Sequence, residues 1–125
     1  MVNEDLLRTL FVKKSLVNTK NGFSMQMKNS ISDANIIDPI KVEISGESIE
    51  KEKYKDFLID IDGLKIKNSE ISESKPVKFS VKSIATLIFE RSEPLPAEKY
   101  NIRFTKLLTE EYGDIPFTMK ERIRE

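Results

Sequence analysis

The stretch NTKNGFSMQMKN, residues 18–29, carries the pattern that decides the fold class. It begins with Asn21-Gly22, a dipeptide typical of tight hairpin turns. Apolar side chains then occupy every second position, at Phe23, Met25 and Met27. Because successive side chains of a strand point to opposite faces, this period of two predicts a hairpin strand with one buried and one solvated face.

The same alternation recurs in four further segments of the chain. They are IKVEIS (40–45), VKFSVK (77–82), YNIRFTK (100–106) and IPFTMK (115–120). Turn residues separate these segments at short intervals, and all four glycines lie at such breaks. We therefore predict an all-β, immunoglobulin-like antiparallel β-sandwich of about seven to nine strands, with one or two short helical turns.

The length of 125 residues is that of one domain, and we expect a single β-sandwich domain over residues 1–125. Residues 1–9 are expected to form an N-terminal arm or a short helix with Asn3 as its N-cap. A second helical turn is predicted over EKEKYKDF (50–57), and residues 120–125 are expected to form a frayed, charged tail.

Two prolines in EPLPAEKYNIRF (93–104) precede Tyr100, which opens an alternating strand. This arrangement is typical of the tyrosine corner of β-sandwiches, in which the hydroxyl bonds to upstream backbone. The alternative is that Tyr100 is an ordinary core aromatic residue. Both interpretations are structural.

The chain contains no histidine and no cysteine, which excludes catalytic triads, Cys–His pairs, disulfides and thiolate metal sites. We expect no cofactor. With 21 basic and 21 acidic residues the formal net charge is zero, which disfavours nucleic acid as a partner. No apolar run is long enough for a membrane span, and the first residues do not resemble a secretory signal, so we expect a cytoplasmic protein without a membrane partner.

Asp60 and Asp62, in FLIDIDG (57–63), are the first acidic candidates. In a continuous strand they share one face, where two carboxylates could bind a hard cation such as Ca²⁺ or Mg²⁺. The alternative, which we favour, is a solvent-facing strand that runs into an Asp-Gly turn. We therefore expect no metal site.

The segment TEEYGDIPF (109–117) gathers Glu110, Glu111 and Asp114 around Tyr112. Paired carboxylates beside an aromatic ring are typical of sugar-binding and glycoside-cleaving sites. A solvated hairpin tip explains the same residues, and we favour it.

Two surface interpretations are also open. Met25, Met27 and Met119 could line an adaptable binding surface, but their alternation favours the core. Cationic side chains occupy predicted outward positions, and several of them on one sheet would make a cationic face; a solvated face balanced by acids is favoured. These side chains are Lys28, Lys78, Lys82, Arg103 and Lys120.

The order of the segments is similar to that of the small β-sandwich beta subunits of C-glycoside deglycosidases and related small microbial proteins. The likeness runs through FVKKSLVNTKNGFSMQMKNSI (11–31), IKVEISGESIEKEKY (40–54), FLIDIDG (57–63), VKFSV (77–81) and PLPAEKYNIRF (94–104). The chain departs from that family at Glu98, where a glycine is expected, and at Tyr100, where a histidine is usual. The resemblance implies a partner-dependent role, because a separate metal-dependent barrel subunit carries the chemistry in that family; it transfers no catalytic residue.

The expected function is that of a non-catalytic β-sandwich that acts through protein association. It would be a homo-oligomer or the small accessory subunit of a carbohydrate-active enzyme complex. One alternative is a small-molecule or carbohydrate-binding module that uses Tyr112 or Tyr54. The second is a carboxylate-based hydrolase built on the acids of residues 60–62 or 110–114.

Overall fold

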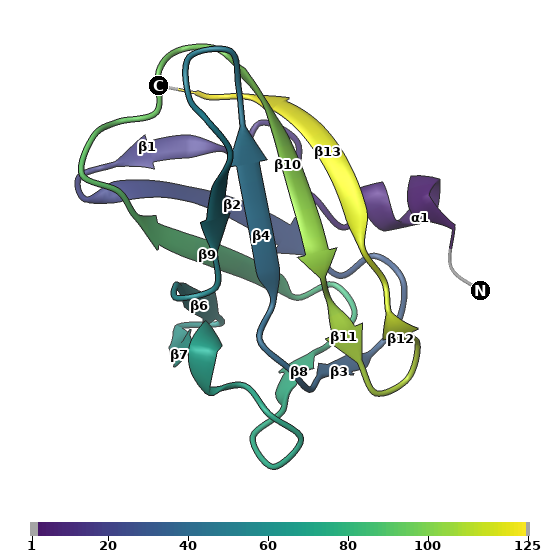
Figure 1. Ribbon diagram of the computed structural model, residues 1–125. Helices are drawn as coiled ribbons and strands as arrows, with labels where there is room; N and C mark the ends of the chain where they lie inside the picture. Colours follow the sequence, from purple (N-terminus) through teal and green to yellow (C-terminus); the bar gives the residue numbers. More distant parts are fainter. Residues whose placement is uncertain (1–2, 125) are drawn as a thin grey trace.

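The computed structural model describes residues 3–124, which form an all-β, sandwich-like fold of antiparallel sheets (Figure 1). The predicted fold class is confirmed. The described residues contain thirteen strands in three sheets rather than about seven to nine strands. The difference arises because segments of two or three residues pair where the sequence shows only turn-like composition, as in β11 (Leu108–Thr109) and β12 (Gly113–Asp114).

The first sheet has the order β1-β2-β9-β6-β7. Its strands are β1 (Val17–Thr19), β2 (Gly22–Lys28), β9 (Ile84–Glu90), β6 (Leu58–Ile61) and β7 (Leu64–Lys67). The predicted hairpin is β1–β2, but Thr19 pairs with Gly22, so the loop is Lys20-Asn21 rather than Asn21-Gly22. Gly22 lies within β2, where a Cβ would come 1.9 Å from the backbone oxygen of Phe89. Glycine at this position therefore permits the close approach of β2 and β9, and it does not form the turn.

The second sheet has the order β13-β10-β4-β5. Its strands are β13 (Phe117–Arg122), β10 (Lys99–Lys106), β4 (Lys41–Ser45) and β5 (Glu52–Tyr54). The core lies between this sheet and the first, where Tyr54 packs edge-on against Phe23 and Phe89. Met25 and Met27 are fully buried in this core, which confirms the core interpretation, and Met119 is half-buried against it.

The third sheet, of short strands, closes one end of the sandwich (Figure 1). Its order is β12-β11-β3-β8, with β3 at Ala34–Ile36 and β8 at Val77–Phe79. A small apolar cavity of about 30 Å³ lies beneath it, and Ala34 and Phe79 are among its lining residues.

Helical structure is limited to α1 (Glu4–Arg8) and the 3-10 helix η1 (Asn68–Glu70). As predicted, Asn3 caps α1: its side chain accepts a hydrogen bond of 2.8 Å from the Leu6 N–H. The helix lies beside β13 (Figure 1). No helix of residues 3–124 is long and apolar enough to cross a membrane.

Two local predictions are wrong. Residues 50–57 are not helical; they contain β5, because Tyr54 fills the inner face of the sheet while Lys53 points outward. Residues 120–124 do not form a frayed tail. Strand β13 runs to Arg122, and the Arg124 N–H donates to the Leu16 carbonyl at 2.8 Å. The predictions for residues 1–2 and 125 lie outside the described residues.

Candidate protein interface

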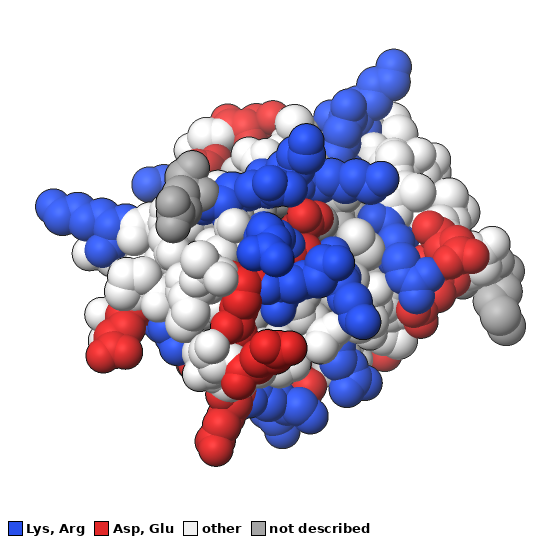
Figure 2. Space-filling model, turned by 90° about the horizontal axis from the view of Figure 1, so that it is seen from above, with Lys and Arg blue, Asp and Glu red and all other residues white. Residues whose placement is uncertain are grey.

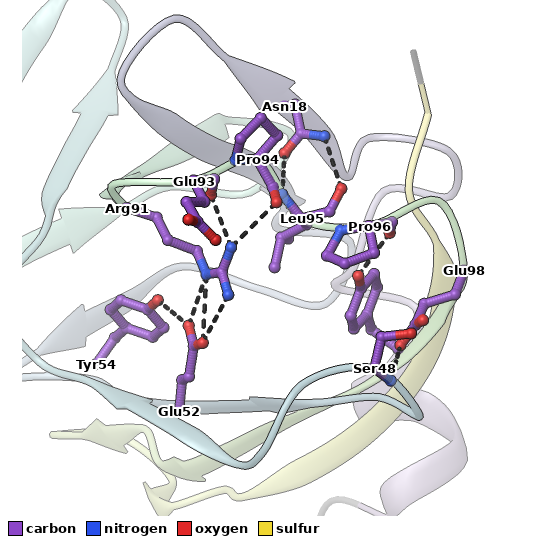
Figure 3. Close-up of polar contacts among 11 residues, drawn as sticks. Asn18, Ser48, Glu52, Tyr54, Arg91, Glu93, Pro94, Leu95, Pro96 and Glu98 are labelled. Carbon is purple, nitrogen blue, oxygen red and sulfur yellow. Dashed lines mark hydrogen bonds and ion pairs between the residues drawn. The ribbon is translucent and has the colours of Figure 1, made fainter.

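The proline-rich loop 91–98, between β9 and β10, is anchored by the Arg91 side chain (Figure 3). Its Nε and Nη2 atoms donate to the Glu52 carboxylate at 3.0 and 2.9 Å. Its Nη1 atom donates to the carbonyl oxygens of Glu93 and Pro94 at 2.7 and 3.1 Å. The Tyr54 hydroxyl donates to the same Glu52 carboxylate at 2.5 Å. One guanidinium therefore connects this loop to β5.

The charges in this network suit a structural role. The hydrogen bond from Arg91 holds the pKa of Glu52 below its ordinary value. Burial, together with the hydrogen bond to Glu52, raises the pKa of Tyr54. Glu52 therefore stays ionised and Tyr54 stays neutral at neutral pH, and neither is poised to exchange a proton.

The rest of the loop is fastened to three further segments. The Tyr100 hydroxyl donates to the Pro96 carbonyl at 2.5 Å, which confirms the tyrosine corner, and burial raises the pKa of Tyr100 to about 12. Asn18 in β1 exchanges two hydrogen bonds of 3.0 and 2.9 Å with the Leu95 backbone (Figure 3). The Glu98 carboxylate accepts from the Ser48 N–H at 2.9 Å. This network holds the loop in place and offers no catalytic pair.

Asp60 lies in strand β6 and Asp62 lies in the turn that follows it, so the two carboxylates do not share one strand face. Asp62 (φ 53°) and Gly63 (φ 84°) are the two loop residues between β6 and β7, and positive φ at both is typical of a type I′ turn. Asp60 accepts a hydrogen bond of 3.0 Å from the Gly63 N–H. Within residues 3–124 no three Asp or Glu side chains gather to hold a metal ion.

The acids of residues 110–114 lie on the hairpin that joins β11 to β12. Glu111 accepts hydrogen bonds from the Asn35 backbone and side chain at 2.8 and 2.9 Å, and these bonds lower its pKa. Asp114 accepts from the Leu107 N–H at 2.9 Å. Glu110 is exposed, and the Tyr112 hydroxyl is hydrogen-bonded to the Ser32 hydroxyl. Glu111 and Asp114 are thus occupied in holding the hairpin tip.

The five cations singled out from the sequence are all exposed but do not share one sheet. Lys28 lies on the first sheet, Lys78 on the third, and Lys82 in the segment after β8. Arg103 in β10 and Lys120 in β13 do lie on the same face of the second sheet. Sequence reasoning therefore identified two members of a larger cationic group.

The outward side of the second sheet carries six basic side chains and one acidic side chain on its strands, and we call the basic group the cationic face. Its members are Lys41, Lys53, Lys99, Arg103, Lys120 and Arg122. Lys106 is not counted, because it lies beyond a β-bulge and forms an ion pair with Asp38. The charges on the outward side of the first sheet are more nearly balanced. Its strands carry three basic and two acidic side chains there: Lys28, Lys65, Lys67, Asp60 and Glu90.

On the strands of the second sheet, Glu43 is the one acidic residue that shares the outward side with the cationic face. Its side chain is 16% exposed, and its buried Oε1 atom has no hydrogen-bond partner among the described residues. The Lys51 Nζ and Arg103 Nη1 atoms lie 3.7 and 3.9 Å from that oxygen. Glu43 therefore offsets part of the positive charge but leaves most of it.

A hollow of about 340 Å³ opens on the cationic face. Lys99 and Lys120 line it, together with Ser45, Asn101 and Glu47. Figure 2 views the end of the molecule where β10 begins and β13 ends, and it shows Lys and Arg side chains gathered over the middle of this end, with acidic side chains between and beside them. The arrangement can bind carboxylates but contains no group set for catalysis.

Comparison with known proteins corrects one expectation. No curated protein matches the chain. Residues 6–124 match the family model described as hydroxymethylglutaryl-CoA reductase, N-terminal domain. The resemblance to C-glycoside deglycosidase beta subunits is therefore wrong; it rested on turn and strand motifs that any small β-sandwich can share. The match spans nearly all of the described residues, and the chain belongs to the family of hydroxymethylglutaryl-CoA reductase N-terminal domains.

Proposed function

We propose that this chain is a non-catalytic β-sandwich that acts through protein association, and that its partner is the catalytic part of a hydroxymethylglutaryl-CoA reductase. The observation that carries the proposal is the unequal distribution of charge. The formal net charge of the chain is zero, yet the strands of the second sheet carry six basic side chains and one acidic side chain on their outward side. Such segregation favours recognition of a complementary surface.

The proposed partner is taken from the description of the family. Its description names the N-terminal domain of a reductase, so the relatives that gave the family its name carry this domain as one part of an enzyme. The chain itself lacks histidine and cysteine, and three of its acidic candidates accept hydrogen bonds from backbone N–H groups: Asp60, Glu111 and Asp114. The catalytic part, in the same polypeptide or in another, would then supply the chemistry.

The two alternatives have less support. Tyr54 is half-buried between aromatic rings and bonded to Glu52, so it presents no open platform to a sugar. Of the acids in the two sets proposed for a hydrolase, Asp60 accepts from the Gly63 N–H, Glu111 from the Asn35 N–H and Asp114 from the Leu107 N–H. Neither arrangement supplies a pair of carboxylates with a substrate between them.

Native mass spectrometry can test the proposal. The chain is mixed with the catalytic part of the reductase from the same organism, and bovine serum albumin serves as an acidic control protein. We expect a complex of defined stoichiometry with the catalytic part and none with albumin. A chain that stays monomeric at high concentration and forms no complex with the catalytic part would contradict the proposal.

A further inference from the structure

We infer that the cationic face is the docking surface of this chain and that its occupant is an acidic surface patch on the protein partner. This inference rests on the proposed function and names the surface through which association occurs. Three features of the face support it: uncompensated charge, a hollow that fits a carboxylate, and a charge pattern suited to a protein.

The first feature is repulsion within the face. Lys99 in β10 lies directly opposite Arg122 in β13, and like charges at directly opposed positions destabilise a sheet. Lys120 occupies the next outward position of β13. Among residues 3–124, none of these three side chains forms an ion pair. A carboxylate from a partner would relieve this repulsion, so the fold keeps an unfavourable arrangement that binding can correct.

The second feature is the hollow on the face. Lys99 and Lys120 line it from neighbouring strands, together with the polar residues Ser45 and Asn101. A volume of about 340 Å³ admits an aspartate or glutamate side chain of a partner. Gly46 helps to form the wall, and a Cβ there would come 2.2 Å from the Glu98 carboxylate and 2.8 Å from the Tyr100 ring. Tyr100, a buried aromatic residue, also lines the hollow.

The third feature distinguishes an acidic protein from a nucleic acid. A phosphate backbone is bound best by an uninterrupted positive surface on a basic chain. Here Glu43 lies inside the face, Glu47 lines the hollow, and the sequence pI is about 6.4. A protein surface with carboxylates and a few basic groups complements this mixture. A flexible chain of carboxylates can also avoid the two acids, whereas the rigid, continuous phosphate backbone of a duplex would meet both of them.

Charge reversal with a matched control tests the docking surface. The triple variant Lys99→Glu, Lys120→Glu and Arg122→Glu changes the cationic face. The control, Lys28→Glu, Lys65→Glu and Lys67→Glu, makes the same change in net charge on the first sheet. Affinity for the catalytic part of the reductase is measured by calorimetry at low and moderate salt, and circular dichroism verifies folding.

We expect the face variant to lose at least about tenfold in affinity and most of its salt dependence, and the control to stay within about twofold. Equal losses in both variants, or no loss in the face variant, would overturn the inference. If the face variant does not fold, Lys99→Ala with Lys120→Ala replaces it, with the same expectations.

A second arm separates this inference from the proposed function. If the unmodified chain does not bind the catalytic part, the proposed function fails, and the face is tested with immobilised poly-L-glutamate and with duplex DNA. Binding of poly-L-glutamate that is lost in the face variant but kept in the control supports an acidic protein as occupant. If the chain does not bind poly-L-glutamate, or binds DNA more strongly than poly-L-glutamate, the inference is overturned.

Discussion

Replacement of Tyr100 by phenylalanine measures the contribution of the tyrosine corner. The ring is fully buried and stays in place, so the substitution creates no cavity. Only the hydroxyl that donates to the Pro96 carbonyl at 2.5 Å is removed, and that carbonyl loses its partner. We expect the free energy of unfolding to fall by about 1–2 kcal/mol. With an unfolding entropy of about 0.26 kcal/mol/K for 125 residues, Tm falls by about 4–8 °C.

Thermal and urea unfolding followed by circular dichroism measure this change. Tyr112→Phe is the matched control, because its hydroxyl contacts Ser32 at an exposed site, and we expect a loss below about 0.5 kcal/mol. Alkaline pH gives a second readout. Since the folded pKa of Tyr100 is raised from 10.0 to about 12, its contribution is present below pH 10 and lost as pH rises through 12. A Tyr100→Phe variant as stable as the unmodified protein, or a control that loses as much, would refute the role of the corner.

Three further predictions concern stability. Gly22→Ala should lower the free energy of unfolding by about 3 kcal/mol or more, because the added Cβ would overlap a backbone oxygen of β9. Gly63→Ala should lower it by less, because the new Cβ meets no neighbour and only the positive φ is unfavourable. Urea unfolding that ranks the two variants in the opposite order would contradict this. The hydrogen bond from Arg91 lowers the pKa of Glu52 below 4.5. The ionised Glu52 side chain therefore stabilises the folded state above that pH, and this stabilisation is lost as the pH falls. Urea midpoints measured from about pH 7 to pH 3 should therefore fall more steeply for the unmodified protein than for Glu52→Gln, and parallel curves would exclude this contribution. Ala34→Val, which adds two methyl groups beside the cavity of about 30 Å³, should raise the free energy of unfolding by about 0.5–1 kcal/mol; a lower Tm would show that the cavity does not admit them.

The sequence predicts the fold class well because alternation of side chains is a local signal. Phe23 and Met25 are buried as their positions require, and Tyr100 forms the expected corner. The error at residues 50–57 has a physical cause: a run of lysine and glutamate is compatible with a helix, and only pairing with β4 makes it a strand. The shifted hairpin loop at Gly22 likewise depends on contact with β9, which is distant in sequence.

The candidate surface was predicted only in part, because it depends on which strands are neighbours. Arg103 and Lys120 could be placed outward from their alternation, and so could Lys99 and Arg122. The sequence does not show that β10 lies between β13 and β4, and this order is what brings the four side chains to one face. The acids at residues 110–114 illustrate the converse, since residues adjacent in sequence turned out to bond to separate segments.

Covalent labelling of lysines in the complex of this chain with the catalytic part of the reductase tests whether the cationic face is the docking surface. The extent of acetylation at each lysine is measured by mass spectrometry for the free and the bound chain. We expect protection in the complex at the lysines of the cationic face, above all Lys99 and Lys120, and unchanged labelling at Lys65 and Lys78 on the other two sheets. Protection of Lys65 or Lys78, with Lys99 and Lys120 labelled as in the free chain, would contradict it.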